Sequence, residues 1–114
     1  MRKSNVILSV AVLMILALVA LPAVLRTAAA SPPTAEVKID NFSFAPATLT
    51  VKAGTQITWT NGDDIPHTVV SDDQTFKSKV LDTDEKFTFT ASKPGTYSYF
   101  CSIHPKMTAK VVVE

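Results

Sequence analysis

The chain has 114 residues, of which 46% are hydrophobic and 18% are charged, and its formal net charge is +1. This length accommodates one small domain and excludes a second one. After Arg26, eight basic residues stand against ten acidic residues. This balance excludes the strongly basic surface that a nucleic-acid-binding protein needs.

The first 30 residues have the pattern of an export segment. A basic start is followed by Val6–Leu25, which carries no charged residue. Pro22 interrupts this apolar run near its end, and Ala28–Ala30 offers the small side chains that a signal peptidase recognises. We therefore expect residues 1–30 to be a signal peptide, cleaved after the alanine triplet. About 20 apolar residues also suffice to span a bilayer, so the alternative is an uncleaved membrane anchor over residues 6–25. Both readings place the domain in the periplasm or otherwise outside the cytoplasm.

The rest of the chain divides into a polar leader, residues 31–35, and a domain, residues 36–114. In this domain short β-rich runs alternate with turn residues at nearly regular spacing, and no helix-length stretch shows a 3.6-residue period. The pattern predicts an all-β fold, either a β-sandwich or a small barrel. The predicted strands are Glu36–Asp40, Thr48–Lys52, Gln56–Thr60, His67–Ser71, Glu85–Ala91, Gly95–Cys101 and Thr108–Val113. The segment Asp72–Asp84 has the weakest pattern and is compatible with a short strand or a helical turn.

Alternation along the predicted strand Gly95–Cys101 indicates which side chains face the core. Tyr97, Tyr99 and Cys101 share one face, because successive side chains of a strand point to opposite sides. We expect this face to point inward and Phe100 to point outward. The expected role of Tyr97 is packing, with its hydroxyl group fixing a nearby corner of the chain.

Four side chains with metal-binding chemistry stand out beyond the export segment. His67, Cys101, His104 and Met107 are the only histidines, cysteine and methionine there, and three of them lie within seven residues. Each alone could be an ordinary core or loop residue. Together they offer a thiolate, two imidazoles and a thioether, a set that copper accepts as both Cu(I) and Cu(II), whereas structural zinc sites prefer Cys₄ to Cys₂His₂. The sequence therefore predicts a site for one copper ion, which also accounts for a lone cysteine in an exported protein.

Residues 36–114 resemble the plastocyanin/azurin family of cupredoxins, and most of all its amicyanins. The matching motifs are Phe44-x-Pro46, Val51-x-x-Gly54, Trp59-x-Asn61, Pro66-His67, Pro94-Gly95-x-Tyr97-x-Tyr99-x-Cys101 and Cys101-x-x-His104-Pro105-x-Met107. The resemblance implies a Greek-key β-sandwich with copper at one end, bound by His67 from an inner loop and by the other three ligands from the last loop. The chain departs from the amicyanins at Thr68, where asparagine is usual, and at Ile103 and Lys106 inside the ligand loop.

By this resemblance the function is that of a type 1 (blue) copper protein, a monomeric one-electron carrier between exported redox partners. The implied partners are a c-type cytochrome and an upstream donor such as a dehydrogenase, with no nucleic acid and with a membrane only if the leader is retained. The alternative is a periplasmic copper buffer or delivery protein. A copper enzyme needs further histidines for a second metal site, and both histidines are already used. The acidic pairs Asp63-Asp64 and Asp72-Asp73 could form a docking face or simply a solvated rim.

Overall fold

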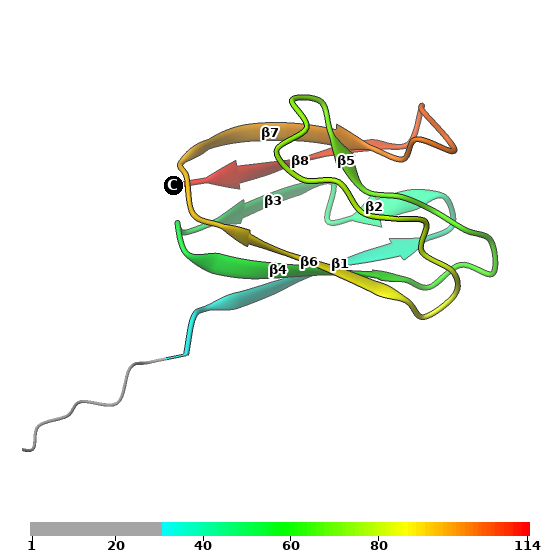
Figure 1. Ribbon diagram of the computed structural model, residues 1–114, viewed down its shortest axis with the longest axis horizontal. Coiled ribbons are helices and arrows are strands. Elements are labelled where there is room, and N and C mark those ends of the chain that lie inside the picture. The colour runs from blue at the N-terminus through cyan, green and yellow to red at the C-terminus, as the bar shows by residue number, and fades with distance from the viewer. Residues whose placement is uncertain (1–30) are drawn as a thin grey trace, which may run out of the picture. The chain divides into compact units, whose positions relative to one another are not determined.

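The computed structural model describes residues 31–114, so the predicted signal segment lies outside the described residues. The described part consists of strands joined by loops (Figure 1). The strands are β1 (Thr34–Asp40), β2 (Ser43–Ala45), β3 (Thr48–Val51), β4 (Thr55–Asn61), β5 (Val70–Ser71), β6 (Lys86–Ala91), β7 (Gly95–Phe100) and β8 (Thr108–Val113). Within residues 31–114 there is no helix with the length and apolarity needed to cross a membrane.

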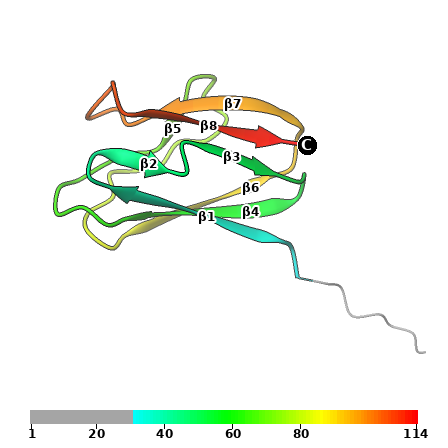
Figure 2. The same ribbon diagram turned by 180° about the vertical axis from the view of Figure 1, so that it is seen from behind.

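The strands form two four-stranded sheets that face each other as layers of a sandwich (Figure 2). One sheet has the order β2-β1-β4-β6 and the other has the order β3-β8-β7-β5. The pairs β1–β4 and β3–β8 are parallel, while the remaining neighbours are antiparallel. The predicted all-β sandwich is confirmed, and the barrel alternative is wrong.

The core between the sheets is built on the inward-facing residues of β4. Their side chains are buried at alternate positions, as a strand with one face on a core requires. Trp59 is completely buried and its ring lies 5.4–5.6 Å from the rings of Phe76, Phe87 and Tyr99. Aromatic pairs at these separations add to the stabilisation that comes from burying their area. This aromatic cluster holds the two sheets together beneath the loops that carry the predicted ligands.

The alternation predicted for β7 agrees with the observed burial. Tyr99 is buried, and Cys101, one residue past the end of β7, is buried as well. Tyr97 is half-buried and its hydroxyl donates a hydrogen bond to the carbonyl of Lys93 at 2.7 Å, so it fixes the corner before β7 as predicted. Phe100 lies on the opposite face of β7, where it is half-buried.

The predicted strands need correction at three places. Strand β1 begins at Thr34, inside the predicted leader, because Thr34 and Ala35 already pair with β4. The predicted strand His67–Ser71 is shortened to β5, because the backbone of His67 instead exchanges two hydrogen bonds with Leu81 in an isolated bridge. Leu81 belongs to the segment Asp72–Asp84, in which Lys77 and Leu81 form isolated bridges and no helical turn is present. The short strand β2 was not predicted, because it is reached through a turn in which Asn41 and Phe42 have positive φ.

Candidate metal centre

The four predicted ligands lie in two loops at one end of the sandwich. His67 belongs to the loop between β4 and β5, while Cys101, His104 and Met107 belong to the loop between β7 and β8. Both loops lie at the end opposite the C-terminus (Figures 1 and 2). Strands β4 and β7 belong to different sheets, so the sandwich itself brings residues 34 positions apart into contact.

Three of the four side chains meet at one point. The Sγ atom of Cys101 lies 3.7 Å from Nδ1 of His67 and 3.6 Å from Nδ1 of His104. All three candidate ligand atoms lie within 4.8 Å of one another. His67 and Cys101 are fully buried, whereas His104 is half-buried and faces the surface. A sulfur and two imidazole nitrogens that converge in this way can share one small metal ion.

Met107 is the last residue of the ligand loop before β8. Its side chain is buried, its N–H group donates to the carbonyl of His104 at 2.9 Å, and its carbonyl accepts the N–H group of Cys101 at 3.1 Å. The N–H group of His104 in turn donates to the carbonyl of Cys101 at 3.1 Å. These backbone bonds fold the loop back on itself, so the spacing of two residues between successive ligands is the spacing of a compact turn.

The thiol of Cys101 is set up to ionise. Burial alone raises its pKa, but the hydrogen bond from the N–H group of Thr68 and the close contacts of the sulfur with the imidazoles of His67 and His104 and with the His104 backbone lower the pKa from 9.0 to about 6. The Thr68 nitrogen lies 3.3 Å from Sγ. Because the thiolate is the form that binds metals, the chain presents a ready sulfur ligand at neutral pH.

Asp63 fixes the orientation of the His67 ring through Nε2, the ring nitrogen that does not face Cys101. Nε2–H of His67 donates to Oδ2 of Asp63 at 2.8 Å, so the lone pair of Nδ1 is left pointing toward Cys101. The same carboxylate accepts the N–H groups of Asn41 at 2.6 Å and Phe42 at 3.0 Å. Although burial raises the pKa of Asp63, the hydrogen bonds from Phe42, Asn41 and His67 outweigh it and lower that pKa below 3.8. Asp63 therefore has a structural role in the centre, unlike the solvated or docking role considered from the sequence.

We expect Asp63→Asn to weaken metal binding by about 10- to 100-fold, the usual cost of disturbing a carboxylate that supports a metal-ligating histidine. The amide nitrogen of asparagine cannot accept a hydrogen bond, so one of the three N–H donors loses its partner. Competition with a chelator of known affinity measures the change. Asp64→Asn is the matched control, because Asp64 is exposed and the change in charge is the same. Equal losses in both variants would show that charge alone, rather than the hydrogen bond to His67, is responsible.

Phe42 is a further component of this end that the sequence did not reveal. Its ring is 53% exposed, and its centroid lies 5.8 Å from the His67 ring and 5.1 Å from the His104 ring in edge-on contacts. Ile103 beside His104 is 43% exposed. We call Phe42 and Ile103 the apolar rim. The half-buried edge of His104 lies beside this rim, in an apolar part of the surface.

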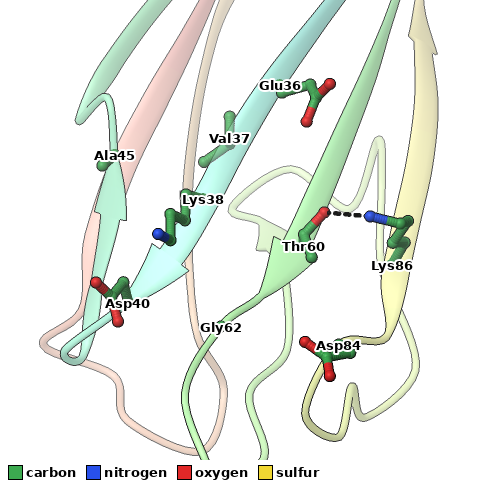
Figure 3. Close-up of a pocket in the computed structure, with 9 residues that line it drawn as sticks. All are labelled: Glu36, Val37, Lys38, Asp40, Ala45, Thr60, Gly62, Asp84 and Lys86. Atoms are coloured by element: carbon green, nitrogen blue, oxygen red, sulfur yellow. Dashed lines mark hydrogen bonds between the residues drawn. The ribbon is translucent and has the colours of Figure 1, made fainter.

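A groove lies elsewhere, on the outer face of the sheet that contains β1 (Figure 3). It has a volume of about 550 Å³. In this groove Nζ of Lys86 donates to Oγ1 of Thr60 at 3.0 Å, and Glu36, Lys38 and Asp84 add further charged groups. None of the predicted ligands lines it, so the groove is separate from the metal centre.

Comparison with known proteins agrees with the donor set. The model of the cupredoxin-like domain family matches residues 8–113. Amicyanin of Paracoccus versutus is 33% identical over 83 residues, which cover 68% of this chain and 63% of that protein. Amicyanin-alpha of Methylorubrum extorquens is 36% identical over 84 residues, covering 69% of this chain and 71% of that protein. The chain thus spans somewhat less than two thirds of the length of the first of these relatives.

A solved structure shows the same fold at similar identity. The purple cupredoxin from Nitrosopumilus maritimus superimposes with a TM-score of 0.68 at 33% identity, covering 70% of this chain and 99% of that one. A donor set of one cysteine, two histidines and one methionine, in a chain similar to amicyanins, is that of a type 1 site for a single copper ion. The chain belongs to the cupredoxin family, as the sequence motifs predicted.

Proposed function

We propose that this protein is an exported one-electron carrier whose copper is bound by His67, Cys101, His104 and Met107. The observation that carries the proposal is the convergence of Cys101 Sγ with Nδ1 of both histidines at 3.6–3.7 Å. When bound, copper supplies the Cu(I)/Cu(II) couple. The protein side chains hold the ligand atoms in place, exclude water from the buried side, and expose one histidine edge to a partner.

The burial of the ligands favours a carrier over a copper buffer or delivery protein. His67 and Cys101 are fully buried. His67 is hydrogen-bonded to Asp63, and the Cys101 sulfur accepts the N–H group of Thr68. A delivery site must open so that the metal can leave, whereas ligands held rigidly in both oxidation states suit electron exchange without loss of metal. The only ligand with an exposed edge among the three that converge is His104.

We infer that residues 1–30 direct the domain out of the cytoplasm, either as a cleaved signal peptide or as a retained membrane anchor. The uncharged run Val6–Leu25 and the alanine triplet that follows it support this assignment. The partners would then be exported redox proteins that exchange electrons with this domain, namely a c-type cytochrome and a donor such as a dehydrogenase. The domain itself would be a monomer with Greek-key connections. A monomer fits the need for brief encounters with two different partners at one surface.

Electron exchange with a small c-type cytochrome tests the proposal. In an anaerobic stopped-flow experiment, the copper-loaded protein should pass one electron per molecule to or from the cytochrome, and metal analysis afterwards should find the copper still bound. Release of copper with each turnover would favour the buffer or delivery alternative. A protein that keeps its copper but exchanges no electrons with the cytochrome or with small redox mediators would contradict the carrier function.

Replacing Ile103 with glutamate should slow this electron exchange by about tenfold, which corresponds to about 1.4 kcal/mol. A charge introduced into the apolar rim around His104 loses its hydration when the partner covers this surface, so the encounter becomes less favourable. The visible spectrum should stay unchanged, since Ile103 is not a ligand. Thr90→Glu adds the same charge near the opposite end of the sandwich, at an exposed position of β6, and serves as control. Equal rate constants for Ile103→Glu and the unmodified protein at low salt would place the exchange site elsewhere.

Met107→Leu should leave copper bound and raise its reduction potential. The thioether of Met107 would be the weakest of the four donors, and the strength of this weak donor tunes the potential of such sites. Leucine fills a similar buried volume without donating electrons, so the cupric form loses more stabilisation than the cuprous form. Voltammetry of the two loaded proteins measures the shift. Complete loss of copper would instead show that Met107 is essential for holding the metal.

A further inference from the structure

We propose that Thr68 and Ser102 form a hydroxyl chain that donates a hydrogen bond to the Cys101 sulfur and thereby raises the copper reduction potential. This inference rests on the proposed copper ligation by Cys101. Neither hydroxyl group is a metal ligand, so both residues would act by positioning protons around the sulfur.

The backbone and the hydroxyl group of Thr68 both make hydrogen bonds around the Cys101 sulfur. Thr68 is only 5% exposed. Its N–H group lies 3.3 Å from Cys101 Sγ, and its own Oγ1 lies 3.8 Å from the same sulfur. The Oγ1 atom also lies 2.7 Å from the backbone nitrogen of Ser102 and 2.7 Å from Oγ of Ser102. One threonine hydroxyl therefore has three neighbours besides its own carbon.

The number of lone pairs decides where the hydroxyl proton of Thr68 goes. A hydroxyl oxygen has two acceptor lone pairs and one proton. The Ser102 N–H group, which can only donate, occupies one lone pair. If the Ser102 hydroxyl donates as well, both lone pairs are used and the proton of Thr68 is left for the sulfur. In this arrangement every contact of Oγ1 is satisfied, which buried polar groups require.

This arrangement makes a directed chain from the surface to the ligand. Ser102 is exposed, so its hydroxyl oxygen can also accept a hydrogen bond from water. Each bond in such a chain polarises the next, so the donation to sulfur is strengthened. A thiolate that accepts both N–H and O–H bonds from Thr68 donates less charge to copper. That loss disfavours Cu(II) more than Cu(I), so the chain raises the potential.

The opposite proton arrangement makes a different prediction. If the Thr68 hydroxyl donates to Oγ of Ser102, the sulfur receives only the N–H bond. Removing the serine hydroxyl would then free the Thr68 proton for the sulfur, and the potential would rise. In the arrangement proposed here, Ser102→Ala removes the outer donor and the potential falls. The sign of the change in this single variant therefore separates the two arrangements.

The experiment is voltammetry of the copper-loaded protein with Thr68→Val, Thr68→Ser, Ser102→Ala and the double variant Thr68→Val/Ser102→Ala. Thr68→Val should lower the Cu(I)/Cu(II) ratio at a fixed electrode potential by about tenfold, or about 59 mV for one electron. Thr68→Ser should restore most of the loss. Ser102→Ala should lower the potential by less, and it should have no effect once Thr68 is valine. An unchanged potential in Thr68→Val, or a raised potential in Ser102→Ala, would overturn the proposal.

A measurement without copper keeps the test decisive if Thr68→Val folds poorly. In the metal-free unmodified protein, the Thr68 hydroxyl proton should give a slowly exchanging NMR signal that is lost in Thr68→Val and persists in Thr68→Ser. Rapid exchange of this proton with water would contradict the proposed bond to sulfur. If the unmodified loaded protein lacks intense visible absorption, it is the copper site proposed for Cys101 that fails. If that absorption is present and the variants do not shift the potential, only the hydroxyl chain fails.

Discussion

Replacing Cys101 with serine should abolish the intense visible absorption of the copper-loaded protein. That absorption requires charge transfer from a thiolate to Cu(II), and Cys101 is the only cysteine of the chain. Its buried sulfur lies within 3.7 Å of both candidate histidine ligands, so no other soft anion is placed to substitute for it. A serine hydroxyl keeps the shape of the side chain but supplies an oxygen with a much higher pKa.

Absorption spectra of both proteins, normalised to bound copper, measure this effect. Circular dichroism of the metal-free forms shows whether the serine variant keeps the fold. A correctly folded Cys101→Ser protein that bound copper and retained most of the absorption per copper would refute the assignment of Cys101 as ligand. Loss of the band with the fold retained agrees with it.

Truncating Trp59 should have the largest effect on stability, about 3–5 kcal/mol. Trp59 is completely buried and contacts three aromatic rings that belong to other strands or loops. The free energy of unfolding of a small domain is only about 5–15 kcal/mol, so Trp59→Ala removes a large share of the stability of the protein. Urea unfolding of the metal-free protein, followed by circular dichroism, measures the loss.

Trp59→Phe is the control for this prediction. The indole Nε1 atom is buried and has no hydrogen-bond partner among residues 31–114. Phenylalanine keeps most of the aromatic contacts without a buried N–H group, so it should cost much less than alanine. If both substitutions cost the same, a property of tryptophan other than packing holds the two sheets together.

The sequence predicted most strands because their hydrophobic alternation is a local property. The strands with clear alternation, such as β4 and β8, match to within a residue or two. The errors arose where long-range bonds override the local pattern. His67 lies in a β-rich run, but its backbone pairs with Leu81, which is 14 positions away, and its side chain turns toward Cys101.

The sequence predicted the ligand types of the candidate centre, but it did not predict the residues that contact and orient these ligands. The spacing of Cys101, His104 and Met107 is a local signal, and the added histidine His67 completes a donor set with copper chemistry. Asp63 precedes His67 by four residues, but its hydrogen bond to His67 can be recognised only once the loop geometry is known. Phe42 could not be predicted, because it reaches the centre through a positive-φ turn on the neighbouring strands.

The contact between Thr68 and Ser102 could not be predicted from the sequence either. They lie 34 positions apart, and nothing in either local segment indicates that their hydroxyl groups meet. Their contact depends on the packing of the loop before β5 against the end of β7, which belong to chain segments joined only by the folded sandwich. Hydroxyl groups carry no hydrophobic pattern, so their role emerges only from the distances to Cys101.

Repeated redox cycling in the presence of a Cu(I) chelator tests most directly whether this protein carries electrons rather than copper. One equivalent of reductant should bleach the visible absorption of the loaded protein, and one equivalent of oxidant should restore it. We expect full recovery over many cycles, with one copper ion bound per chain throughout, because His67 and Cys101 are buried and held in place. Transfer of copper to the chelator on reduction, with progressive loss of absorption, would contradict it.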